Sequence, residues 1–131
     1  MLSLYKLVLM DKTKHIVNFD FLLESTESDL PLIETMIRIF HQTYPDYVLQ
    51  MNDLVQDKNW EELSRIAHKA KATTSAFGMS ESSDFLSLIE HSAKKQPENV
   101  HFKEIIDKFE YQCKIASNEL NEFITKYPNH D

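Results

Sequence analysis

The sequence contains very little glycine, cysteine and proline. Among its 131 residues, one is glycine, one is cysteine and four are proline. A single cysteine excludes an intramolecular disulfide, which suits a reducing compartment. A single glycine excludes the glycine-rich loops that cradle nucleotide phosphates, and this argues against a chain that is itself a kinase. Because all-β folds place glycine at their turns, the scarcity also favours helices joined by short connections.

Positive charge and long apolar runs are scarce as well. The 14 basic residues are outnumbered by 21 acidic ones, for a net charge of −7, and a chain this acidic would repel the phosphates of nucleic acid. The apolar stretch from Leu2 to Met10 is interrupted by Lys6 and is much shorter than the ~20 residues that span a bilayer. We therefore expect a monomeric cytoplasmic protein without nucleic-acid or membrane partners.

Apolar residues recur at helical spacing through most of the chain. They predict a short helix at about 19–24 and longer helices at about 30–55, 59–77, 80–95 and 98–126. This pattern predicts an all-α fold, an antiparallel four-helix bundle with a short accessory N-terminal helix.

The expected domain boundaries and helix ends follow from the same pattern. We expect the bundle to occupy residues 17–127, after an N-terminal arm (residues 1–16) of uncertain structure. Ser28 or Asp29 can cap the first long helix, and Gly78 can end the second. On the third long helix, the residues expected to face the core are Phe85, Leu88 and Ile89. On the last helix, Cys113 lies at core spacing and is expected to serve packing rather than catalysis.

His68 is the residue of the second long helix that carries candidate chemistry. The apolar residues of that helix cluster on one face, and His68 lies about 140–150° from its centre at ~100° per residue, so the ring should point at solvent. Arg65, Lys69 and Lys71 surround it, with no acidic residue between positions 63 and 80. An exposed histidine with a neutral ring nitrogen can act as a nucleophile, and positive charge nearby would favour a phosphoryl group on it. Glu90 could reach this level if the next helix folds back about Gly78.

Three segments resemble the histidine-containing phosphotransfer (HPt) domain family. The segment AHKAKATTSAFG (residues 67–78) is similar to the family signature A-H-x-x-K-G-x-x-x-x-x-G, with His68, Lys71 and Gly78 at the matching positions. Upstream, FHQTYPDYVLQMNDLVQDKNWEELSRIAH and NFDFLLESTESD resemble the helices that precede the family's histidine, so the likeness covers roughly residues 17–125. The chain departs from the pattern at Ala72, where the family usually has glycine, and at Ala70, where it has a larger aliphatic residue.

The resemblance implies a phosphorelay carrier rather than an enzyme. His68 would accept the phosphoryl group through Nε2, Lys71 would stabilise it, and Glu90 would orient the ring. The partners implied are response-regulator receiver domains and a hybrid histidine kinase. The chain would need no cofactor of its own, because the receiver supplies Mg²⁺. The residues expected to line the docking surface around His68 are Ser64, Arg65, Lys69, Ala72, Ser75, Ala76 and Met79.

Two other hypotheses about the function are compatible with the sequence. The extra methyl group of Ala72 could crowd an incoming receiver, so the chain could instead be a helical adaptor that binds receiver or kinase domains without carrying phosphate. A metal-binding bundle of the di-iron type needs a Glu-x-x-His pair on each of two helices. The sequence holds one such spacing, Glu98 to His101, which is weak support for a metal site.

Overall fold

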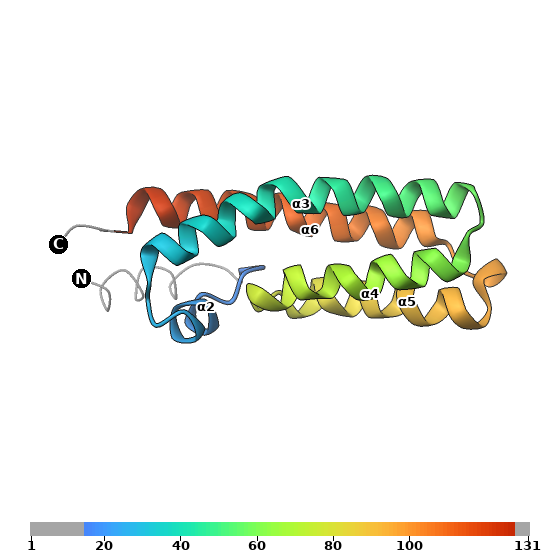
Figure 1. The fold of residues 1–131 in the computed structure, drawn as a ribbon, viewed down its shortest axis with the longest axis horizontal. Coiled ribbons are helices and arrows are strands. Elements are labelled where there is room, and N and C mark those ends of the chain that lie inside the picture. Colours follow the sequence, from blue (N-terminus) through green and yellow to red (C-terminus); the bar gives the residue numbers. More distant parts are fainter. Residues whose placement is uncertain (1–14, 128–131) are drawn as a thin grey trace.

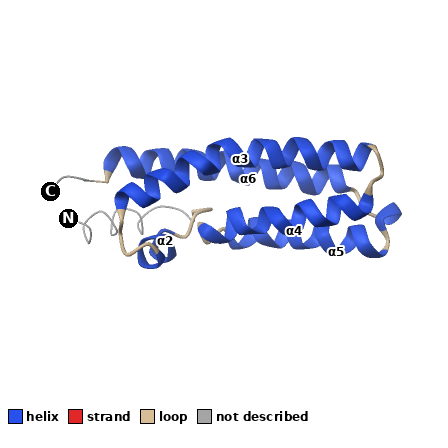
Figure 2. Ribbon diagram, in the orientation of Figure 1, coloured by secondary structure: helices blue, strands red, loops and turns tan. Residues whose placement is uncertain are grey.

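The computed structural model describes residues 15–127, and within this range the regular elements are helices only (Figures 1 and 2). The prediction of an all-α bundle is confirmed. The predicted N-terminal arm lies outside the described residues, apart from His15 and Ile16. No described helix is both long enough and apolar enough to cross a membrane. The elements are α2 (Phe19–Ser25), α3 (Leu30–Gln56), α4 (Trp60–Ala76), α5 (Ser80–Lys95), η1 (a 3-10 turn, Pro97–Asn99) and α6 (Phe102–Lys126).

Four long helices form the bundle, with α3 and α6 side by side along one edge and α4 and α5 along the other (Figure 1). With 27 and 25 residues, α3 and α6 are longer than α4 and α5, which have 17 and 16. The surplus length extends past the end of α4, where α2 covers it (Figure 1). There Phe19 stacks on Phe123 at 5.2 Å between ring centroids, and Leu22 is fully buried. The accessory helix therefore closes the end of the core that α4 and α5 leave open.

Polar residues cap three of these helices, and one of these caps is predicted by the sequence. The side chain of Asn59 accepts a hydrogen bond from the backbone N–H of Glu62 at the start of α4. Asn18 does the same for α2, and Asp29, one of the two candidate caps, does it for α3. Each cap satisfies a backbone donor that the first helical turn leaves without a partner. They fix where each helix begins and, with it, which residues face the core.

The inner face of α5 differs from the one predicted. Leu88 is 49% exposed, so the expectation that it faces the core is wrong, whereas Leu86 and Ile89 are fully buried. The buried residues Ser82, Leu86, Ile89 and Ala93 recur every three or four positions, and Leu88 lies outside this stripe. Ser82 belongs to it because its hydroxyl donates to the side-chain oxygen of buried Gln112 on α6.

Cys113 packs in the core, as predicted. It is fully buried on α6. Burial, with a smaller contribution from the charge of Glu110, raises the pKa of its thiol far above the ordinary value. A thiol held in its neutral form is a poor nucleophile, so the residue serves packing.

Gly78 makes the turn that folds α5 back along α4. Its φ is +61°, in the left-handed region. The backbone N–H of Met79 donates to the carbonyl of Thr74 at 3.0 Å, closing the end of α4. A Cβ atom at position 78 would lie 2.7 Å from the Cβ of Asn18, whose N–H donates to the Phe77 carbonyl. The prediction that this glycine ends the helix is confirmed, and the turn also docks against the start of α2.

Glu119 on α6 holds the segment that precedes α2. Its two carboxylate oxygens accept hydrogen bonds from the backbone N–H groups of Ile16 and Val17, both at 2.9 Å. The Nδ1 atom of His15 lies 3.5 Å from the same carboxylate. One side chain thus attaches the N-terminal end of the described chain to the last helix.

Candidate functional site

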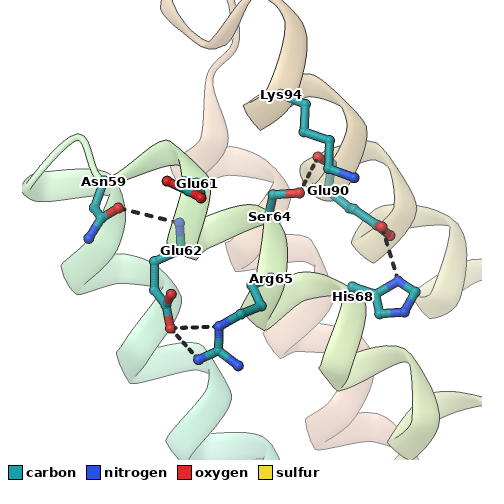
Figure 3. A pocket seen from close by; sticks show the side chains of 8 residues that line it. All are labelled: Asn59, Glu61, Glu62, Ser64, Arg65, His68, Glu90 and Lys94. Carbon is teal, nitrogen blue, oxygen red and sulfur yellow. Dashed lines mark hydrogen bonds and ion pairs between the residues drawn. The ribbon is translucent and has the colours of Figure 1, made fainter.

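His68 lies on the outer face of α4, and 69% of its side chain is exposed. Its Nδ1 atom is 3.0 Å from Oε2 of Glu90 on the neighbouring helix α5 (Figure 3). An ionised carboxylate can only accept, so in the neutral ring Nδ1 carries the hydrogen and Nε2 carries the lone pair. Nε2 is directed away from Glu90 (Figure 3). The arrangement therefore presents a nucleophilic nitrogen to solvent in one defined tautomer.

Glu90 is an almost buried acid whose carboxylate contacts His68 and Lys71. Its side chain is 8% exposed, and its Oε1 atom lies 2.8 Å from Nζ of Lys71. Lys71 also donates to the hydroxyl of Ser87 at 3.3 Å. The backbone carbonyl of Glu90 accepts a hydrogen bond from the buried hydroxyl of Ser64 on α4, at 2.9 Å. These contacts fix the carboxylate at the level of His68.

The charge state of Glu90 follows from these contacts. Burial alone would raise the pKa of its carboxyl group. The hydrogen bond and charge of Lys71, with the smaller effect of His68, outweigh that burial, so the pKa lies below its ordinary value. The carboxylate is therefore ionised at neutral pH and can accept a hydrogen bond from the Nδ1–H group of His68.

This lowered pKa predicts a specific acid sensitivity. A carboxyl group whose pKa is lower in the folded chain stabilises the fold above its unfolded-state pKa, and this contribution is lost as the pH falls through the folded-state value. The wild type and Glu90→Gln should therefore differ most in free energy of unfolding at neutral pH. The difference should shrink as the pH falls below the ordinary value of 4.5. Urea unfolding at a series of pH values measures it.

Glu34→Gln, on the exposed side of α3, controls for the substitution itself. A difference between the wild type and Glu90→Gln that stays constant from neutral to acid pH would contradict the assignment.

The positive charge around His68 is more strongly neutralised than the local sequence indicates. Lys71 pairs with Glu90 from α5, and Nε of Arg65 pairs with Glu62 one turn earlier on α4, at 2.9 Å. Lys69 is exposed on the same helix. Counting charges between positions 63 and 80 misses both acids, because one precedes the window and the other arrives from the next helix.

An open pocket extends from His68 toward the start of α4, between α4 and α5 (Figure 3). Its lining residues are Asn59, Glu61, Glu62, Ser64, Arg65, His68, Glu90 and Lys94. The sequence pattern around His68 does not point to Asn59, Glu61, Glu62 or Lys94. Lys94 follows Glu90 by one helical turn, so it could have been found once Glu90 was placed beside His68.

Two of the expected docking residues are not on the surface. Ser64 is 3% exposed because it faces α5, where its hydroxyl bonds the Glu90 carbonyl. Met79 is 1% exposed because its apolar side chain turns into the core directly after Gly78. The expectation that these two side chains line a docking surface is therefore wrong.

The other expected docking residues remain available around His68. Arg65, Lys69, Ala72 and Ser75 are exposed on α4, and Ala76 is half-buried. Their role in docking stays a prediction.

The residues considered for a metal site lie where α5 connects to α6, at the end of the bundle opposite α2 (Figure 1). Glu98 is in η1, and His101 precedes the first turn of α6. Within residues 15–127, no three His, Cys, Asp or Glu side chains are grouped so that they could hold a metal ion.

Comparison with known proteins gives one result. No curated protein and no solved structure matches the chain. The family model described as "Hpt domain" matches residues 35–124, which include α4, α5 and most of α3 and α6. Hpt domains act in phosphotransfer in two-component phosphorelays, where they interact with receiver domains and kinases. Because the match covers more than half of the chain, the protein belongs to the Hpt domain family.

Proposed function

We propose that the chain accepts a phosphoryl group on Nε2 of His68 from a receiver-domain aspartate and passes it to another receiver. The observation that carries this proposal is the pairing of an exposed imidazole with a nearly buried carboxylate, at 3.0 Å. That pairing leaves Nε2 as the lone-pair nitrogen, facing the solvent from which a partner must approach. The chain is a carrier without kinase activity of its own, works as a monomer in the cytoplasm and receives phosphate that a hybrid histidine kinase has supplied.

The transfer step needs few groups from this chain. The Nε2 lone pair attacks the phosphorus of the receiver's aspartyl phosphate, the P–O bond breaks, and its electron pair returns to the aspartate carboxylate. The receiver brings the Mg²⁺ that neutralises charge on the transferred group. Glu90 orients the ring, and Lys71, one turn after His68, can turn from Glu90 toward the phosphoryl oxygens. Onward transfer to a second receiver is the same step in reverse.

The docking surface is proposed around the ring. Arg65, Lys69, Ala72 and Ser75 are exposed within two turns of His68 on α4, with Ala76 at the edge of this group. Small side chains at 75 and 76 would let a receiver's surface approach the ring closely.

A transfer assay tests the proposal. The purified chain is mixed with each of a panel of phosphorylated receiver domains, and label on the chain is followed for acid lability and base stability, the signature of phosphohistidine. We expect label from at least one receiver, none from ATP alone, and a labelled peptide that contains His68. Labelling with ATP in the absence of any partner would contradict the assignment as a carrier.

The adaptor remains the second candidate because Ala72 is exposed one turn after His68. Its methyl group lies where an incoming receiver would pack, and crowding there would hinder close approach without preventing binding elsewhere. The same panel separates the two functions. Receivers that bind the folded chain but never label it would support the adaptor and overturn the carrier.

A further inference from the structure

The contact between His68 and Glu90 has consequences for the phosphorylated ring as well as for the free one. Glu90 is close to Nδ1 and nearly buried, so little water can replace it as the acceptor. The charged groups around this contact are Glu61, Glu62, Arg65 and Lys71 from α4 and Lys94 from α5. Of these, Lys71 contacts Glu90 directly. The carboxylate thus stays in place when the other ring nitrogen is modified.

We propose that Glu90 shortens the lifetime of the phosphoryl group on His68 by keeping the Nδ1 proton on the phosphorylated ring. The inference rests on the proposed function and deepens it, because it makes Glu90 a positioning residue for onward transfer. A carrier built in this way passes phosphate on quickly and stores it poorly.

The bonds that form and break explain the importance of this proton. When Nε2 attacks phosphorus, the ring keeps its Nδ1 proton and becomes positively charged. When the phosphoryl group leaves, the P–N bond breaks, its electron pair returns to Nε2, and the ring departs as neutral imidazole. A phosphorylated ring without the Nδ1 proton would have to depart as an imidazolide anion, a far poorer leaving group. The proton on Nδ1 therefore controls the rate of loss, whether to a receiver or to water.

A carboxylate holds this proton better than an amide would. A hydrogen bond between two charged groups is roughly twice as strong as a neutral one, and the low exposure of Glu90 limits screening by solvent. Ser64 holds Glu90 in position by bonding its backbone carbonyl, and Lys71 binds Oε1 in the unphosphorylated chain. Glutamine could accept the same hydrogen bond but would lack the charge that favours the protonated ring.

The lifetime can be measured without knowing the natural partner. Phosphoramidate phosphorylates histidine directly, because its own P–N bond breaks and ammonia leaves as the new P–N bond forms. The wild type and Glu90→Gln are labelled, the donor is removed, and the loss of label is followed at several pH values around neutral. We expect loss to be about three- to tenfold slower in Glu90→Gln. The variant should also slow further as the pH rises, while the wild type changes little.

Lys71→Met separates this effect from a simpler one. Glu90→Gln also releases Lys71, which could then stabilise the phosphoryl group by itself. Under our proposal, the difference between Glu and Gln at position 90 persists when both chains also carry Lys71→Met. If the difference disappears in that background even at the alkaline end of the pH series, where Glu90 is ionised without its lysine partner, the freed lysine explains it and the inference is overturned.

The remaining outcomes distinguish this inference from the proposed function. A labelled wild type with the same lifetime as Glu90→Gln overturns the inference and leaves the carrier function intact. So does a wild-type rate that falls steeply as the pH rises through neutral, since the ring would then lose its proton despite Glu90, and this measurement does not require the variant to be labelled. If neither phosphoramidate nor any receiver labels the wild type, both proposals fail.

Discussion

Replacing His68 by glutamine is expected to abolish phosphoryl acceptance and leave the bundle folded. The substitution removes the ring nitrogen that would form the P–N bond, and an amide nitrogen, whose lone pair is delocalised, cannot take its place. The free energy of unfolding should change by no more than about 0.5 kcal/mol, because the side chain is 69% exposed. A glutamine amide can also donate to Glu90 in place of Nδ1.

The measurement is the receiver transfer assay together with urea unfolding of both chains. His91→Gln is the matched control, because it makes the same substitution at the exposed residue directly after Glu90. It should keep its label, unlike His68→Gln. Label that survives in His68→Gln would place the phosphoacceptor elsewhere. Loss of label accompanied by unfolding would not count for the proposal, which is why both measurements are made on each chain.

Gly78→Ala is expected to lower the free energy of unfolding by about 2–5 kcal/mol. A left-handed conformation costs a residue with a Cβ about 1–2 kcal/mol, and forcing extra atoms into a packed site typically costs about 1–3 kcal/mol. Both apply here, because φ is +61° and the new Cβ would lie 2.7 Å from the Cβ of Asn18. Asn18 cannot simply move aside, since its N–H donates to the Phe77 carbonyl at 3.0 Å.

Lys58→Gly gives a control with the opposite sign. Lys58 already has a φ of +56° just after α3, so glycine relieves strain there while adding freedom to the unfolded chain, and we expect a gain of about 0.5 kcal/mol. Both variants can be followed through the fluorescence of Trp60, the single tryptophan, which lies against Phe102 at 5.3 Å. A Gly78→Ala chain as stable as the wild type would show that the turn can relax away from α2.

The helical face of His68 could be predicted because periodicity is a property of one helix. Ala67 and Ala70 are fully buried and His68 points outward, as a repeat of 3.6 residues requires. Glu90 could be placed beside it because a single glycine turn connects two antiparallel helices. In both cases the information lies within a short stretch of sequence.

The errors arose where a second helix decides the environment. Ser64 was expected on the surface because a helical wheel separates core from solvent and does not show that α5 packs beside α4. The pairing of Lys71 with Glu90 was missed for the same reason. The apolar side chain of Leu88 predicts a core position, but the stripe that includes Leu86 and Ile89 leaves it outside. The periodicity of a helix can be read from its own sequence, but the helix that packs against it cannot.

The attachment of the N-terminal segment to Glu119 sets a limit that a truncation from the N-terminus cannot pass without cost. A chain trimmed to begin at His15 retains both backbone donors to this carboxylate, at Ile16 and Val17. A chain trimmed to begin at Phe19 loses both backbone donors, so the partly buried carboxylate of Glu119 on α6 is left without them. Such a chain also lacks Asn18, which caps α2 and bonds the end of α4. Truncation that reaches past residue 15 therefore becomes destabilising within the next few residues, although residues 16–18 belong to no helix.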